Sequence, residues 1–224
     1  MNENWRCARE QVITYARRLL TERLVFYTAG NLSVRVPGEP ALLAVTPTST
    51  PYDELEPEDI VIVGTDGEIV DGRRPPTSEL SMHTLICARR PEIGAVVHTH
   101  SPAAMTMANL GWTLPAILTG LVEATGGDVR TSPYSASGSA EMADLTEAAL
   151  RDRGATFLRY HGLLSVGADL HHAYRAASVV EGTCWVYLTL RGIGEVHELP
   201  TDQVNWIASF WRAQFPDAAA PPAP

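Results

Sequence analysis

The sequence predicts an α/β protein in which helices cover one mostly antiparallel sheet. Two long segments, residues 4–27 and 169–190, place apolar residues at helical spacing. Several short apolar or alternating segments, separated by turn residues, have the pattern of strands, and an Asp-Gly pair between two of them indicates a hairpin. Neither an internal repeat nor an interdomain linker interrupts the 224 residues. A single domain is therefore expected over residues 1–215, with residues 216–224 as a flexible tail.

The N-terminal half is expected to begin with the helix over residues 4–27, because Gly30 and the residue after it would end the helical pattern. A second helix, over residues 79–90, is indicated by the hydroxyl residues Thr77 and Ser78, which can cap free N–H groups at a helix start. Strands are expected in this half at residues 32–36, 42–45, 60–63, 68–70 and 93–97.

The C-terminal half continues the alternation of helices and strands. The segment 139–153 has acidic residues early and arginines late, as the dipole of a helix favours. The segment 156–166 indicates two strands on either side of His161 and the glycine that follows it. Further helices are expected at residues 102–109 and 169–190 and around the aromatic residues of 206–211.

The composition excludes several classes of partner. The formal net charge is -9 and no basic run occurs, so nucleic acid is not expected, because its phosphates require a clustered positive surface. No apolar stretch reaches the roughly 20 residues that span a bilayer, and the polar N-terminus lacks a signal-peptide core. We therefore expect a cytoplasmic protein without a membrane partner, whose three scattered cysteines are reduced.

The chain contains no lysine: all 17 basic residues are arginine. A side-chain Schiff base is therefore impossible, which excludes lysine-dependent aldolases and pyridoxal-phosphate enzymes. Any carbonyl chemistry in this protein needs another electron sink, and a metal ion is the obvious one.

Two histidines, His98 and His100, end an apolar segment that indicates a buried strand. Residues i and i+2 of a strand point to the same face, so the two imidazoles can bind one metal ion. A lone histidine there would more often be an ordinary buried residue, but two imidazoles on one face each need a hydrogen-bond partner or a metal. His161 and Glu79 supply a further imidazole and a carboxylate. Three imidazoles with a carboxylate or a water form the ligand set of a catalytic zinc site, so we predict one Zn²⁺ per subunit.

Three short segments rich in hydroxyl and small residues have the character of anion-binding loops. Hydroxyl groups and free N–H groups at a helix start can bind a phosphate, and Glu79 would lie directly beside such a site. Each loop alone is more often an ordinary turn, and no P-loop sequence occurs. Together the three loops suggest a phosphate cradle built without lysine, from Gly30-Asn31, Thr48-Ser49 and Thr77-Ser78.

Taken in order and spacing, these motifs resemble the class II aldolase/adducin family. The resemblance covers about residues 5–191, nearly the whole chain. It rests on Gly30-Asn31-Leu32-Ser33, Thr46-Pro47-Thr48-Ser49, Thr77-Ser78-Glu79, Ala95-Val96-Val97-His98-Thr99-His100-Ser101 and Tyr160-His161-Gly162.

The resemblance implies a three-layer α/β/α sandwich and a homotetramer of fourfold symmetry with active sites at the subunit interfaces. It also implies that His98, His100 and His161 bind zinc, and that Glu79 is a catalytic acid/base that can occupy the fourth position on the metal. Tyr134 matches a tyrosine that reaches the active site of a neighbouring subunit. The phosphate of the substrate would bind to Gly30, Asn31, Thr48, Ser49, Thr77 and Ser78.

The activity that this resemblance implies is zinc-dependent cleavage of a ketose 1-phosphate, such as L-fuculose 1-phosphate, to dihydroxyacetone phosphate and an aldehyde. A pentulose-5-phosphate 4-epimerase and a sugar-acid-phosphate decarboxylase remain alternatives, as does a non-catalytic, adducin-like scaffold. Two positions depart from the family pattern, because glycine is usual at Ser49 and serine at Thr77. Both replacements keep a backbone N–H and a hydroxyl, but the Cβ of Ser49 narrows the predicted phosphate pocket.

Overall fold

A computed structural model describes residues 2–215 of the chain. Its centre is an eight-stranded sheet of order β4-β3-β2-β1-β5-β8-β7-β6. Neighbouring strands run antiparallel except β6 and β7, which are parallel. The predicted mostly antiparallel sheet is therefore confirmed. The strands are β1 (Asn31–Val36), β2 (Glu39–Val45), β3 (Val61–Gly64), β4 (Ile69–Asp71), β5 (Ala95–Thr99), β6 (Arg130–Ser132), β7 (Ala155–Leu158) and β8 (Gly162–Gly167).

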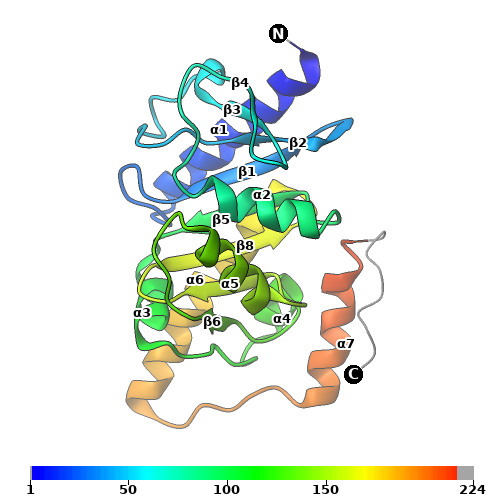
Figure 1. Ribbon diagram of the computed structural model, residues 1–224. Coiled ribbons are helices and arrows are strands. Elements are labelled where there is room, and N and C mark those ends of the chain that lie inside the picture. The colour runs from blue at the N-terminus through cyan, green and yellow to red at the C-terminus, as the bar shows by residue number, and fades with distance from the viewer. Residues whose placement is uncertain (1, 216–224) are drawn as a thin grey trace.

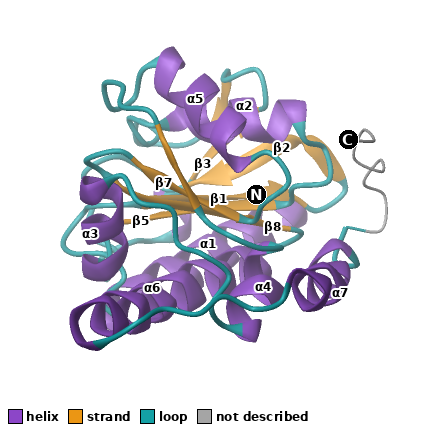
Figure 2. Cartoon of the chain, turned by 90° about the horizontal axis from the view of Figure 1, so that it is seen from below, coloured by secondary structure: helices purple, strands orange, loops and turns teal. Residues whose placement is uncertain are grey.

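Helices cover both faces of this sheet. Figure 2 shows α2 and α5 on one face and α1, α3 and α6 on the other, which is the predicted three-layer α/β/α sandwich (Figures 1 and 2). The helices are α1 (Glu3–Thr21), α2 (Leu80–Arg89), α3 (Pro102–Leu110), α4 (Thr119–Thr125), α5 (Ala140–Leu150), α6 (Leu170–Ile193) and α7 (Thr201–Arg212), with a 3-10 turn η1 (Pro57–Asp59).

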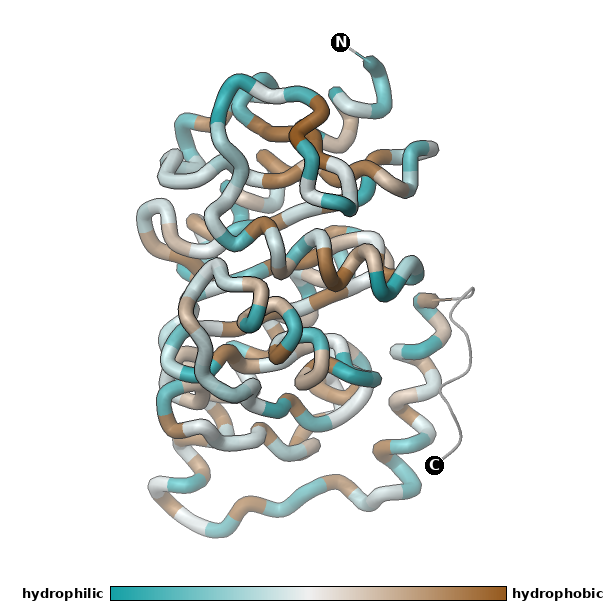
Figure 3. Tube along the Cα trace, viewed as in Figure 1, coloured by the Kyte–Doolittle hydropathy of each residue, from teal (hydrophilic) through white to brown (hydrophobic). Residues whose placement is uncertain are grey.

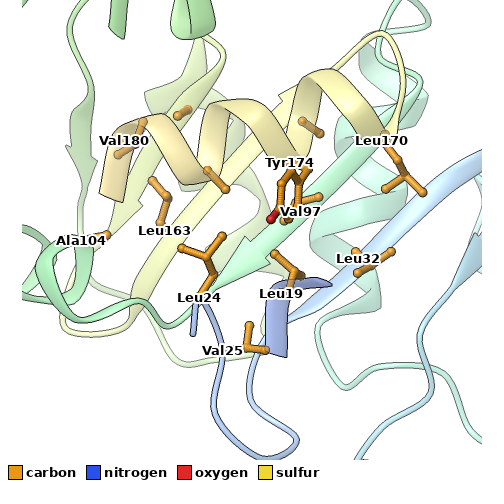
Figure 4. Close-up of a cluster of buried hydrophobic side chains, with 14 of the residues drawn as sticks. Leu19, Leu24, Val25, Leu32, Val97, Ala104, Leu163, Leu170, Tyr174 and Val180 are labelled. Atoms are coloured by element: carbon orange, nitrogen blue, oxygen red, sulfur yellow. The ribbon is translucent and has the colours of Figure 1, made fainter. Parts of the chain in front are cut away.

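The central strands β5 and β8 are buried along their whole length, because each lies between two layers of helices. In Figure 4, Val97 of β5 and Leu163 of β8 belong to the cluster of buried side chains that includes Tyr174 and Val180 of α6. A polar side chain on these strands therefore has no water to bind and must find its partners inside the protein.

Helix α1 ends six residues earlier than its predicted end at residue 27. Arg23 takes a left-handed backbone, φ +59°, and its N–H donates to the carbonyl of Leu20 while that of Leu24 donates to Leu19. This pair of bonds is a Schellman ending, which usually has glycine at the left-handed position. Because this chain has an arginine at that position, no residue in the sequence indicated that the helix ends there.

The C-terminal half contains one helix that the sequence did not predict and one that is longer than predicted. Helix α4 has seven residues, includes a glycine and begins without a side-chain cap, so no start signal marked it. Helix α7 spans twelve residues rather than the aromatic segment alone. Hydrophobic and hydrophilic residues alternate along α7 in Figure 3, and Ile207, Ala208 and Trp211 form its buried face.

Within residues 2–215, no helix combines the length and the apolar character that crossing a bilayer requires. The predicted tail, residues 216–224, lies outside the described part of the chain.

Candidate metal centre and phosphate cavity

The three predicted histidines converge on one point where β5 and β8 meet their loops. Their candidate ligand nitrogens all lie within 4.8 Å of one another. The centroids of each pair of rings are 4.8 Å apart, and the ring planes cross at 67–77°. His98 is the last but one residue of β5, and His161 directly precedes β8, so the β5–β8 pairing brings together ligands that are distant in sequence.

The hydrogen bonding of His98 fixes which nitrogen faces this point. Its Nδ1 lies 2.9 Å from the carbonyl oxygen of Leu163, which can only accept, so Nδ1 carries the proton. Nε2 is then unprotonated, its lone pair can bind a metal, and it lies 2.9 Å from Nε2 of His100. Burial lowers the pKa of His98 to about 4 and that of His100 to about 3, so both rings are neutral at physiological pH. Neutral imidazoles oriented by a backbone carbonyl are the form that binds a divalent metal.

The Glu79 carboxylate lies beside the triad. Its two oxygens are 3.3 Å from Nε2 of His98 and 3.4 Å from Nε2 of His161, and the residue is 4% exposed. Burial alone would raise the pKa of this carboxyl, but the neighbouring His98 and hydrogen bonds from Asn31 and Ser137 outweigh it and lower the pKa to about 2. Three imidazoles and one ionised carboxylate fit a Zn²⁺ ion in ligand type and number.

A chain of buried hydrogen bonds holds Glu79 in place. Asn31 donates through its amide to a Glu79 oxygen at 2.8 Å, so its own oxygen faces Nε2 of His83 at 2.6 Å. Nδ1 of His83 then accepts from the Ser33 hydroxyl at 2.8 Å. Burial lowers the pKa of His83 to about 4, which keeps the ring neutral and this direction of bonding intact. Asn31, predicted as a phosphate ligand, thus also orients the carboxylate.

A cavity of about 190 Å³ joins the three predicted loops to the metal centre. Two of the loops lie side by side, because the N–H of Thr48 donates to Pro75 and that of Thr77 to Thr46. The cavity is lined by all six predicted phosphate ligands, Gly30, Asn31, Thr48, Ser49, Thr77 and Ser78, and also by Glu79, His100, Ser137 and His161.

Ser49 has a left-handed backbone, φ +51°. This conformation is strained for a residue with a Cβ, which gives a physical reason for the glycine that the family pattern has there. Position 30 requires glycine, because its φ is +80° and a Cβ there would lie 2.7 Å from the carbonyl oxygen of His98.

Tyr134 does not line the phosphate cavity. It is 64% exposed, its ring lies 5.9 Å from that of Tyr160, and it lines an adjoining cavity of about 220 Å³. His161 and Ser137 line both cavities, so the two cavities adjoin each other beside the candidate metal centre.

No sequence pattern pointed to Ser137, whose hydroxyl donates to a Glu79 oxygen at 2.7 Å. It lies in a loop of small residues, where a serine carries no pattern. His83 stands one helical turn after Glu79, and that spacing was the available signal for its place in the network.

The comparisons with known proteins agree with this geometry. The family profile described as "Class II Aldolase and Adducin N-terminal domain" matches residues 10–188. A 5-deoxy-D-ribulose 1-phosphate aldolase of Bacillus thuringiensis is 38% identical over 200 residues, covering 89% of this chain and 93% of its own. A 5-methylthioribulose-1-phosphate/5-deoxyribulose-1-phosphate aldolase of Rhodospirillum rubrum is 36% identical over 216 residues, or 96% of each chain.

A solved L-fuculose 1-phosphate aldolase superposes with a TM-score of 0.87 at 31% identity, covering 90% of this chain and 94% of that one. The profile match spans the histidine triad and its loops, and the two sequence relatives and this superposition each extend over most of the chain. The chain therefore belongs to the class II aldolase and adducin family.

Proposed function

We propose that this protein is a zinc-dependent aldehyde-lyase that reversibly cleaves a ketose 1-phosphate to dihydroxyacetone phosphate and an aldehyde. One observation supports the proposal: a single cavity of about 190 Å³ is lined both by the three hydroxyl-rich loops and by His100 and His161 of the triad. A substrate bound there has its phosphate in the loops and its carbonyl carbon beside the metal centre. This is the arrangement that carbon–carbon cleavage next to a carbonyl requires.

The ion would be held by His98, His100 and His161, with Glu79 able to occupy a fourth position. Three imidazoles favour zinc over manganese or magnesium. When bound, the ion supplies a Lewis acid that stabilises the negative charge left on the three-carbon fragment, the role that a lysine Schiff base plays elsewhere.

Glu79 moves the proton at C3 of the three-carbon fragment. Its lowered pKa, about 2, keeps it ionised in the free protein, so in the condensation direction it can accept this proton. In the cleavage direction the same group returns the proton to C3. Asn31 and Ser137, which donate to its two oxygens, hold the carboxylate in the orientation that this transfer needs.

Tyr134 exchanges a proton with the oxygen on C4 as the aldehyde leaves. Its high exposure supports a role across a subunit boundary, in the site of a neighbouring copy of the chain. We accordingly propose a homotetramer of fourfold symmetry with active sites at its interfaces, located in the cytoplasm.

The phosphate loops provide binding energy at a distance from the reacting carbons. With neither lysine nor arginine lining the cavity, the anion is held by hydroxyl groups and backbone N–H groups. Such remote binding orients the substrate and contributes to the rate of the chemical step.

The substrate is a ketose 1-phosphate with a short aldehyde portion. The two sequence relatives are named for 5-deoxyribulose 1-phosphate, and the structural relative for L-fuculose 1-phosphate. Cleavage between C3 and C4 of either compound gives the same phosphorylated three-carbon fragment. The two differ on the aldehyde side, where the cavity beside Tyr134 and Tyr160 adjoins the metal centre.

The test is an assay of released dihydroxyacetone phosphate. Zinc-loaded protein is incubated separately with 5-deoxyribulose 1-phosphate, L-fuculose 1-phosphate and L-ribulose 5-phosphate, with His161→Ala as the metal-site control. We expect release from one or both 1-phosphates and none from the control. Conversion of the 5-phosphate to its epimer without release would identify an epimerase. A fourth incubation, with a sugar-acid phosphate, would identify a decarboxylase if it releases carbon dioxide. Protein purified without chelators that binds no metal would support the scaffold alternative.

A further inference from the structure

His100 lies beyond the ladder of hydrogen bonds that holds His98. The register of β5 and β8 ends at the pair Thr99 and Leu163, so His100 is the first residue after the strand. Its own N–H donates to the carbonyl of Leu24 at 3.2 Å. The remaining support for its backbone has to come from the residues that follow it, which are Ser101 and the first turn of α3.

The start of α3 is capped from another helix. Ser101 is the N-cap residue, and a serine there would ordinarily accept from the first free N–H groups. Its hydroxyl is instead buried without a hydrogen-bond partner within residues 2–215. The N–H groups of Ala103 and Ala104 donate to the carboxylate of Glu181 in α6, at 3.0 and 2.8 Å. Figure 4 shows Ala104 in the same cluster as Val180, the residue before Glu181.

Glu181 is a buried carboxylate, 8% exposed, that forms none of the ion pairs found within residues 2–215. Burying a charge without a counter-ion is costly unless hydrogen bonds compensate for the lost water. Here the indole N–H of Trp185 donates to one oxygen at 3.0 Å, in addition to the two backbone donors. The positive end of the α3 dipole provides further compensation. Within residues 2–215, the carboxylate of Glu181 is therefore hydrogen-bonded to the first turn of α3 and to the indole of Trp185 alone.

From this arrangement we infer that Glu181 is a positioning residue for the metal centre, acting through the first turn of α3 on the backbone of His100. It touches neither the triad nor the phosphate cavity. Two residues, Ser101 and Pro102, separate the ligand from the first N–H that Glu181 binds. When the N–H groups of Ala103 and Ala104 are held by Glu181, the path of the chain after β5 is held as well. That path sets the direction from which the His100 ring approaches the other two histidines.

The inference rests on the metal site of the proposed function but not on its substrate. The test therefore measures zinc affinity without any sugar phosphate, by competition with a chromogenic chelator on the full chain. The variants are Glu181→Ala and Glu181→Gln. The matched control is Asp169→Ala, because Asp169 caps the start of α6, accepting from the N–H of His172, and lies at the end of β8 remote from His161. Thermal melting of each metal-free protein accompanies the titrations.

We expect Glu181→Ala to bind zinc at least about tenfold more weakly, the lower end of the range for residues that orient metal ligands. Glu181→Gln keeps the size of the side chain and one acceptor oxygen, so it should lose less. Asp169→Ala should lower the melting temperature but leave zinc affinity unchanged.

Wild-type zinc affinity in Glu181→Ala would overturn the inference. An equal loss of affinity in Asp169→Ala would also do so, because the effect would then follow general stability. If Glu181→Ala does not fold, the Glu181→Gln titration decides, with unchanged affinity counting against the positioning role. Failure of the wild-type protein to cleave any ketose 1-phosphate would contradict the proposed function while leaving this result intact.

Discussion

A methyl group on Gly162 would lie 2.4 Å from the carbonyl oxygen of Thr99. The same methyl group would be 3.0 Å from Cδ2 of His100 and 3.2 Å from Cε1 of His98. The close approach of β8 to β5 at this point is what lets His161 join the other two ligands. Gly162→Ala should therefore push the strands apart and weaken zinc binding by about tenfold or more, as measured by chelator competition.

Gly182→Ala is the control for this change. Apart from its chain neighbours and the backbone of its own helix, no atom of residues 2–215 lies within 4 Å of a Cβ built at Gly182, which is in the middle of α6. Alanine there should stabilise the helix by about 0.5–1 kcal/mol and leave zinc affinity unaltered. Unchanged zinc binding in Gly162→Ala would show that the centre tolerates a wider strand spacing.

Glu79→Gln should retain zinc and lose most turnover. The amide keeps the shape of the side chain and an acceptor oxygen, but it cannot accept a proton from C3 of the substrate. The loss in kcat expected for removing a general acid/base is about 100-fold to 10,000-fold. Ser137→Ala is the milder comparison, since it removes one hydrogen bond to the carboxylate and leaves the carboxylate itself. Full activity in Glu79→Gln would contradict the assigned role.

Ser49 allows strain and phosphate binding to be separated with two variants. The left-handed backbone of Ser49 destabilises the folded protein by about 1–2 kcal/mol, because the residue has a Cβ. Glycine removes this strain, but its more flexible unfolded chain offsets part of the gain in stability. Ser49→Gly should therefore stabilise the protein by roughly 0.5–1 kcal/mol in urea unfolding. Ser49→Ala keeps the strain and should not stabilise it. Both variants lack the hydroxyl, so both should raise KM for the phosphorylated substrate, and an unchanged KM would exclude that hydroxyl as a phosphate ligand.

Asp59 provides a prediction about pH. It is buried beside the guanidinium groups of Arg73 and Arg74 and accepts the N–H of Glu56, and the bond from Arg73 is the largest influence that holds its pKa well below the ordinary 3.8. A carboxyl whose pKa is lower in the folded protein than in the unfolded chain contributes stability above its ordinary pKa and loses it as the pH falls. Asp59→Asn should cost about 1–3 kcal/mol at neutral pH, because its partners are left incompletely satisfied.

That difference between wild type and Asp59→Asn should shrink as the pH falls below 3.8, when the unfolded aspartate becomes protonated. Urea unfolding of both proteins across the acid range measures it. A difference that stays constant down to the lowest pH at which the protein folds would show that the charge of Asp59 is not what stabilises this region.

The clustering of the three candidate metal ligands could be predicted in part from a local pattern. The spacing of His98 and His100 predicted that their side chains point to one side. The structure places their Nε2 atoms 2.9 Å apart, although His100 follows the last residue of β5. Resemblance to a known family supplied the link from these two to His161. The phosphate loops were predicted in the same way, and all six residues line one cavity.

The groups that orient these side chains could not be predicted from the sequence. The register of β5 and β8 places the Leu163 carbonyl beside His98, and the path of a loop places the Ser137 hydroxyl beside Glu79. Both pairs join residues that are far apart in the chain. A backbone carbonyl has no sequence signature at all. The end of α1 was missed for a related reason, since Arg23 stands in a left-handed conformation that a glycine would have signalled.

The pairing of β5 with β8 also sets when during folding a metal can be bound. His98 and the carbonyl that orients it are 65 residues apart in the chain, and His161 reaches the centre through the same pairing. A growing chain that ends before β8 offers a metal two imidazoles on a strand with an unpaired edge. Tight binding at the proposed metal site would therefore require that β5 and β8 have already paired in their native register.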